Sequence, residues 1–371
     1  MACTLGGDGG RLKAERPAPM LHFTYDQPAI RVVFGVGSID RLADEIRRLG
    51  SMRTLVLSTP EQRADAEKVR ERLGDVAAGV FSEAVMHVPI ETARKARQVA
   101  REYGADCCVA VGGGSTIGLG KAIALDSGLP IVAVPTTYAG SEMTPIYGIT
   151  EDGLKKTGRD PKVLPKTVVY DPSLTVTLPP KVSGPSGMNA IAHCVEGLYA
   201  QNANPIMSLF AAEGIHALAR SLPTVVQEPS NLEARSDSVY GAWLAGMVLG
   251  NVGMALHHKL CHTLGGTFNL SHAEVHTVVL PYATAYNRHA APDAMRIVAE
   301  ALGAGDAAQG LYDLSVRLGA PVALKDIGMP SDGLDRAAEL AVQNPYYNPR
   351  PVEYRAVRQL LEDAFHGKRP A

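Results

Sequence analysis

The spacing of several histidines is the first sign of chemistry in this chain. Asn189 and His193 are four residues apart, as are His258 and His262, so each pair would share one face of a helix. His272 follows in the segment NLSH, which resembles a loop. One such side chain alone is more often structural, but the set indicates a metal-binding or acid–base site. Four further histidines are interpreted as structural. His257 and His276 would lie beside the set on other faces, and His216 and His289 have no partner pattern.

Helical patterns carry these residues in the second half of the chain. From about Ser183 the chain is rich in alanine and leucine, and no strong strand-like run appears. We predict helices over residues 187–200, 205–219, 234–254, 258–265, 291–302 and 306–318. The uncharged run 239–257 is borderline in length for a membrane span, but its glycines favour a buried helix.

The first half alternates apolar runs with charged helical patterns. Strands are predicted over 54–58, 107–111 and 131–134, and helices over 61–73 and 91–103. Apolar strands without polar alternation are typical of a parallel sheet that is covered by helices on both faces. Ligands of such sheets bind at the carboxyl ends of the strands, here the loops after Ser58, Val111 and Val134.

Length and composition bound the class of protein. The chain has 371 residues, too many for one ordinary core, so we expect an α/β nucleotide-binding domain over 21–182 and an all-helical domain over 183–371. Residues 1–20 lack the apolar stretch of a signal peptide and are predicted to be a flexible tail. A net charge of −2 argues against a nucleic-acid or anionic-membrane partner. Five scattered cysteines without a C-x-x-C pair indicate reduced thiols in a soluble, cytoplasmic protein.

A glycine-rich turn follows the strand CCVAV. Gly112, Gly113, Gly114 and Ser115 open a helix, where backbone N–H groups could close on a pyrophosphate. The spacing matches neither common nucleotide fingerprint, and a simple tight turn is the alternative. Further candidate contacts to a dinucleotide are Thr136 and Thr137 after the next strand, with Gly35 and Gly37 as a weaker contribution.

The strand over 54–58 ends at Ser58 rather than at a carboxylate. An acid at this place would normally hold the 2′-hydroxyl of the ribose and repel a 2′-phosphate. The sequence therefore predicts that NADPH is accepted alongside NADH.

The chain resembles the iron-containing (group III) alcohol dehydrogenase family from about Phe23 onward. The resemblance is carried by residues 112–121, 135–142, 171–180, 187–193 and 258–281, and it implies the dehydroquinate synthase-like fold and a homodimer. Within the family the chain is similar to the maleylacetate reductase branch, through the strings GGGSTIGLGK, GMNAIAH and NPYYNPRP.

The family's metal site uses one aspartate and three histidines. These positions fall on Asn189, His193, His258 and His272, and an additional active-site histidine of the family falls on His262. Asparagine removes the only anionic ligand, which argues against a tightly bound divalent metal. A second departure is Gly118, where the family often has aspartate.

The branch implies reduction of maleylacetate, a small dicarboxylate, to 3-oxoadipate in the degradation of aromatic compounds. Histidines, some of them protonated, could bind a carboxylate and stabilise enolate charge without a metal, whereas an aspartate at position 189 would repel the dianion. We expect His262 to be the general acid.

Other candidate contacts lie outside the histidine set. Lys156 could reach the cofactor or a substrate carboxylate, or could be a solvated loop charge. Tyr346, Tyr347 and Arg350 could supply aromatic walls and a carboxylate fork, or could form only a rigid turn between prolines.

Three alternatives stay open. A metal-dependent alcohol dehydrogenase of the same fold would need iron or zinc, and a lyase resembling dehydroquinate synthase would consume no NADH. A non-catalytic nucleotide-binding or metal-sensing module is the third.

Overall fold

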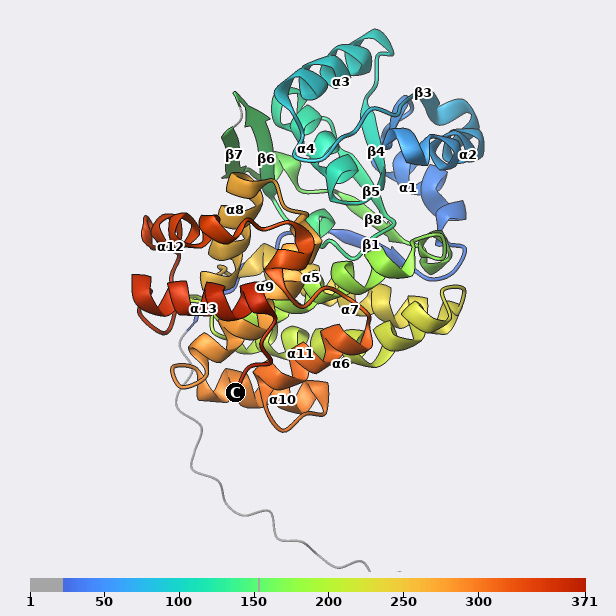
Figure 1. Ribbon diagram of the computed structural model, residues 1–371. Coiled ribbons are helices and arrows are strands. Elements are labelled where there is room, and N and C mark those ends of the chain that lie inside the picture. The colour runs from blue at the N-terminus through green and yellow to red at the C-terminus, as the bar shows by residue number, and fades with distance from the viewer. Residues whose placement is uncertain (1–22, 153) are drawn as a thin grey trace, which may run out of the picture.

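The computed structural model describes residues 23–152 and 154–371. The predicted tail over residues 1–20 lies outside the described residues. A sheet covered by helices forms the first half, and a layer of helices packs below it in Figure 1. An α/β half followed by an all-helical half is the predicted fold class, which is confirmed. The division at residue 183 stays a prediction; the last strand ends at Tyr170, and the first long helix begins at Pro180.

Six parallel strands of the described chain form one sheet. Their order is β1-β8-β5-β4-β2-β3. The strands are β1 (Arg31–Phe34), β2 (Thr54–Leu57), β3 (Ala77–Phe81), β4 (Cys107–Gly112), β5 (Ile131–Pro135) and β8 (Thr167–Tyr170). The three predicted strands, β2, β4 and β5, are confirmed. The sequence pattern missed β1, β3 and β8. Of these, β1 and β3 lie at the two edges of the sheet and are only partly buried.

Helices cover both faces of the sheet. Val56 and neighbouring valines pack against α1 (Leu42–Arg48) and α2 (Arg63–Leu73), while Leu55 and Leu57 point the other way. The helices that cover this second face are α3 (Ile90–Glu102) and α4 (Gly114–Ser127). Burial on both faces explains why the strands are apolar without alternation.

An antiparallel hairpin not predicted from the sequence projects from the sheet domain. It consists of β6 (Ile146–Glu151) and β7 (Leu154–Arg159). At its base Arg159 donates from Nη1 to the carbonyl oxygen of Gly250, 3.0 Å away. The hairpin is thereby attached to the helical half.

The helical half contains the six predicted helices and three others. They are α5 (Pro180–Leu198), α6 (Pro205–Gln227), α7 (Leu232–Asn251), α8 (Leu256–Phe268), α9 (His272–Asn287), α10 (Pro292–Leu302), α11 (Ala307–Arg317), α12 (Leu334–Val342) and α13 (Tyr354–His366). The loop assigned to His272 was wrong, because His272 is the first residue of α9. The polar segment before it is only a tight corner, in which Asn269 adopts a left-handed conformation with φ of 53° and ends α8.

The uncharged run 239–257 is divided between two helices. Helices α7 and α8 meet at 95°, and both contribute buried side chains to the core. Among the described residues no single helix is both long and apolar enough to span a membrane. The bent pair α7 and α8 would be so only when the two helices are taken together, by length and composition.

Candidate active site

The order of the strands places the switch point of the sheet between β2 and β4, where a ligand-binding crevice is expected. The chain leaves β2 through α2 toward β3 at one edge, whereas it leaves β4 through α4 toward β5 on the other side. Connections that diverge from neighbouring parallel strands leave an opening at their carboxyl ends, which is where such sheets bind ligands. The loops after Ser58 and Val111 lie at this opening.

The glycine turn after β4 has room only for backbone. Gly112 has φ of +151°, and a Cβ there would lie 2.5 Å from Thr116 Oγ1. At Gly113 a Cβ would lie 2.9 Å from Thr137 Cγ2. Helix α4 begins at Gly114 without a side-chain cap, and the buried Thr116 Oγ1 has no hydrogen-bond partner in the described chain. An uncapped helix N-terminus with this glycine turn fits a pyrophosphate.

Several other predicted cofactor residues border the same crevice. Ser58 is fully buried at the end of β2, and its Oγ donates to the carbonyl oxygen of Thr59 or to Ser82 Oγ. Thr136 accepts a hydrogen bond of 3.0 Å from Gln62, which thus spans the crevice from the β2 side to the β5 side. Ser115 is the second residue of α4.

Two of the cofactor predictions fall elsewhere. Gly35 and Gly37 follow β1, three strand positions from β4, which is about 14 Å at ordinary strand spacing. Lys156 is exposed on the hairpin and forms an ion pair of 2.6 Å with Glu151. Its contacts match the alternative of a surface charge.

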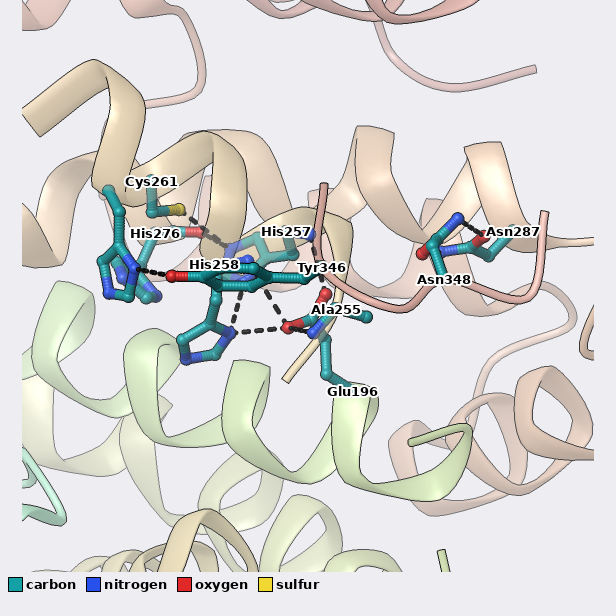
Figure 2. A network of polar contacts seen from close by, with 10 residues as sticks. Glu196, Ala255, His257, His258, Cys261, His276, Asn287, Tyr346 and Asn348 are labelled. Carbon is teal, nitrogen blue, oxygen red and sulfur yellow. Dashed lines mark hydrogen bonds and ion pairs between the residues drawn. The ribbon is translucent and has the colours of Figure 1, made fainter. Parts of the chain in front are cut away.

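Six histidines from three helices form one cluster, which contains the four predicted histidines together with His257 and His276. His193 lies on α5; His257, His258 and His262 lie on α8; His272 and His276 lie on α9. The ring centroids of His193 and His258 are 5.2 Å apart, and those of His272 and His276 are 4.2 Å apart. The ring centroid of His276 lies 4.8 Å from those of both His257 and His258, and these three residues are labelled in Figure 2.

The cluster contains several buried polar atoms without a partner in the described chain. They are Asn189 Oδ1, His193 Nδ1, His258 Nε2 and both ring nitrogens of His276. Buried polar groups are nearly always hydrogen-bonded, so an unsatisfied set concentrated in one place marks a site built to bind something polar.

Glu196 holds the cluster from behind. This fully buried side chain on α5 accepts hydrogen bonds from the backbone N–H groups of Ala255 and His257 at 2.8 and 2.7 Å, and its Oε2 lies 2.7 Å from His258 Nδ1 (Figure 2). Desolvation on burial raises the pKa of Glu196, although His257 and the backbone donors oppose this shift.

Burial keeps four of the histidines neutral. Desolvation lowers the pKa of His257 to about 4, and it lowers the pKa of His193, His258 and His276 well below the ordinary value, with neighbouring histidines adding to each shift. The expected protonated histidines of the site are therefore to be sought among the exposed members of the cluster. The rings of His262 and His272 are exposed.

The segment over 344–351 reaches the cluster through one side chain. The Tyr346 hydroxyl lies 3.0 Å from His262 Nδ1, and burial raises the pKa of this tyrosine. Tyr347 is exposed. Arg350 packs over the ring of Tyr286 at 4.0 Å and donates to its carbonyl oxygen, so its contacts lie away from the histidines. The predicted substrate group is thus brought to the site only in part.

The two halves of the chain meet at the cluster. Gly140, in the loop after β5, has φ of +79°, and a Cβ there would lie 3.2 Å from Gly246 Cα and 3.4 Å from His193 Nδ1. The loop that follows the crevice therefore touches a histidine of the cluster. A ligand extending from the crevice past β5 would reach the histidines.

The sequence pattern missed three residues of this site. His257 and His276 were assigned to other faces, which was wrong. His276 is four residues after His272, so the same spacing rule would have included it if His272 had been placed on a helix. Glu196 is three residues after His193 and shares its face of α5.

Comparisons with known proteins agree with this arrangement. The model for iron-containing alcohol dehydrogenase matches residues 28–172, and the model for the C-terminal part of the Fe-containing alcohol dehydrogenase family matches residues 184–365. A maleylacetate reductase of Burkholderia cepacia is 59% identical over 94% of this chain and 99% of its own length. The chain belongs to the iron-containing alcohol dehydrogenase family. The expected branch is confirmed by further maleylacetate reductases at 50 to 58% identity.

Solved structures match over nearly the whole chain. A putative alcohol dehydrogenase from Ralstonia eutropha is 62% identical with a TM-score of 0.94, covering 95% of this chain and all of its own. Maleylacetate reductase from a Rhizobium strain is 54% identical with a TM-score of 0.91, again covering 95% of this chain and all of its own. A 1,3-propanediol oxidoreductase at 27% identity has a TM-score of 0.88.

Proposed function

We propose that this chain is a maleylacetate reductase, which uses NADH or NADPH to reduce the carbon–carbon double bond of maleylacetate to give 3-oxoadipate in the degradation of aromatic compounds. Relatives that carry this name over nearly the full length support the assignment. The observation in the structure that carries it is Asn189. It places a neutral amide, buried among neutral imidazoles, where the family's metal site has its acid.

The crevice and the glycine turn fit a nicotinamide dinucleotide. When bound, this cofactor supplies the hydride. The N–H groups that open α4 would hold its pyrophosphate, and the hydroxyls of Thr136 and Thr137 border the same place. Because the loop after β5 touches His193, the nicotinamide end would lie on the histidine side.

The donor set does not fit a tightly held iron. Asn189 and three histidines at the family positions leave a divalent ion with its full charge, and amide oxygen is a poor ligand. The nearby carboxylate, Glu196, is occupied by the backbone of α8 and by His258. In the part of the chain that the structure describes, the nitrogens close enough to share an ion belong to His257, His258 and His276. Of these, His257 already forms a hydrogen bond through Nε2 with the carbonyl oxygen of His276. The proposed reduction therefore involves no bound metal.

The proposed site has a buried layer and an exposed layer of side chains, and both suit an anionic substrate. His193 and His258 line the buried part with Asn189, which adds no negative charge to a pocket for a dianion. His262 and His272 face solvent, so a proton that enters the site reaches these rings first. His262, held by Tyr346, is placed to donate the proton that completes the reduction, while hydrogen bonds from the site stabilise charge on the keto oxygen.

The remaining predictions concern the partners of the protein and its location. A small dicarboxylate is the partner that the proposed reaction requires. The homodimer follows from the family resemblance. A cytoplasmic location is in keeping with the four described cysteines, which are buried and free.

One assay tests the assignment. Purified protein should oxidise NADH with maleylacetate, unchanged by EDTA, and metal analysis should find less than one equivalent of iron or zinc. Stoichiometric metal, rapid aldehyde reduction and no turnover of maleylacetate would identify a metal-dependent alcohol dehydrogenase instead. Conversion of a substrate without net NADH consumption would indicate a lyase.

A further inference from the structure

We propose that Glu196 and His257 are positioning residues that hold His258 in one tautomer, with its proton on Nδ1 and the lone pair of Nε2 open to the pocket. The assignment of the tautomer stands on the contacts alone, and only its effect on turnover rests on the proposed function. It concerns a layer of side chains behind the histidines that face the substrate.

Glu196 first fixes the position of helix α8. The helix has no side-chain cap of its own, and Ala255 precedes its first residue. Glu196 reaches across from α5 and accepts from the N–H groups of Ala255 and His257 at 2.8 and 2.7 Å. A buried carboxylate at a helix N-terminus satisfies backbone donors and complements the helix dipole. Because α8 carries His258 and His262, the position of both rings depends on this contact.

His257 next ties α8 to α9. Its Nε2 lies 3.0 Å from the carbonyl oxygen of His276, and a carbonyl oxygen only accepts. His257 therefore donates this hydrogen bond from Nε2. The other ring nitrogen, Nδ1, lies 3.4 Å from His258 Nδ1.

The tautomer of His258 follows from these two neighbours. Its Nδ1 lies 2.7 Å from Glu196 Oε2, which already accepts from the N–H group of Ala255, and 3.4 Å from His257 Nδ1 (Figure 2). A carboxylate oxygen accepts, so the ring nitrogen donates and the proton of the ring is on Nδ1. Nε2, which is buried and has no partner among the described residues, is then an acceptor.

This assignment restricts the roles within the site. Neutral His258 accepts a hydrogen bond from whatever occupies the pocket and donates none to it. The proton that completes the reduction then has to come from another group, in agreement with the role proposed for the exposed His262. Glu196 and His257 touch neither substrate nor cofactor in this scheme and act through His258.

The tautomer is measured directly by ¹⁵N NMR of the wild-type protein with labelled histidine, in which the signals of His258 are assigned by their loss in H258Q. We expect a protonated Nδ1 and an unprotonated Nε2. A proton on Nε2 would overturn the proposal. This measurement needs neither substrate nor a folded variant at position 196, so it stands apart from the outcome of the maleylacetate assay.

Substitution of Glu196 tests the functional consequence. In E196Q the amide group would turn a donor toward N–H groups, so we expect kcat to fall roughly 10- to 100-fold, the cost typical of removing a carboxylate that orients a histidine at a metal site. KM for maleylacetate should change less than about threefold, and the NMR signature of His258 should be altered. E196D, which keeps the carboxylate, should recover part of the loss.

The matched control is E45Q. Glu45 is also a buried carboxylate, but it lies on α1 and pairs with Arg31 at 2.6 Å. E45Q should lose stability while keeping kcat and the His258 signature. A folded E196Q with kcat within twofold of wild type, or with His258 still protonated on Nδ1, would contradict the proposal.

Discussion

The hydroxyl of Tyr346 lies 3.0 Å from Nδ1 of His262, although 84 residues separate them in the chain. His262 stands on the exposed side of the histidine cluster, and Tyr346 comes from the segment between α12 and α13. The contact brings the segment NPYYNPRP to the site and orients the histidine that is placed to donate a proton.

Removal of this hydroxyl should slow the reaction. A typical hydrogen bond contributes about 0.5–1.5 kcal/mol, so we expect Y346F to lower kcat roughly 2- to 10-fold. Steady-state kinetics with maleylacetate measure the effect. Y347F is the matched control, because it removes the neighbouring hydroxyl and keeps the contact between Tyr346 and His262. Equal losses of kcat in Y346F and Y347F would contradict a specific role of the Tyr346 hydroxyl in orienting His262.

Restoration of an acid at position 189 should change the character of the site. N189D returns the anionic ligand of the family's metal site, so metal content after purification should rise, as atomic emission would show. Turnover of maleylacetate should fall at least about tenfold, because like charges brought together cost up to several kcal/mol. Improved turnover in N189D would refute the argument from charge.

The glycine turn should tolerate no side chain at Gly113. A Cβ there would lie 2.9 Å from Thr137 Cγ2, and overpacking of this kind costs about 1–3 kcal/mol. We expect G113A to raise KM for NADH roughly 5- to 100-fold while KM for maleylacetate stays within a factor of about two. G305A serves as control, since nothing lies within 4 Å of a Cβ at that position.

A carboxylate at the end of β2 should introduce cofactor discrimination. Thr59 follows Ser58 at this strand end, where related folds hold the ribose with an acid. T59D should lower kcat/KM for NADPH at least about tenfold relative to NADH, through repulsion of the 2′-phosphate. The neutral T59N should leave the ratio within about twofold. An unchanged ratio in T59D would place the 2′-phosphate elsewhere.

Acid should destabilise the protein through its buried histidines. The pKa of His257 falls from 6.5 to about 4 on burial. Between these values the unfolded chain binds a proton at this residue and the folded chain does not, so the free energy of unfolding falls as the pH falls. For His257 alone the loss from pH 7 to pH 5 is about 2 kcal/mol. The raised pKa of Glu196 works in the opposite direction above pH 4.5.

Urea unfolding at pH 7 and pH 5 measures this dependence. H257Q removes the titrating group and should show a difference between the two pH values that is smaller by about 2 kcal/mol than in wild type. H216Q, at an exposed position on α6, should behave as wild type. A wild-type stability that is equal at both pH values would contradict the expected linkage.

The sequence by itself determined the fold class and the chemical character of the site. Apolar strands such as CCVAV indicate burial on both faces of the sheet. A run of glycines at the start of a helix indicates a place where only backbone fits. The i, i+4 pairs Asn189/His193 and His258/His262 were visible because helical spacing is local. That Asn189 replaces an acid was implied by the resemblance to the family, whose metal site has an aspartate at this position.

Only the tertiary structure decided which residues complete the site and in which state of charge. His276 was missed because its helix begins immediately after a polar corner, and Glu196 because its partners lie about 60 residues away on α8. Arg350 suited a carboxylate by type, but packing directs it onto Tyr286. Charge depends on burial as much as on residue type. Desolvation, which no local pattern reveals, keeps the inner histidines neutral and leaves only the exposed rings in contact with solvent protons.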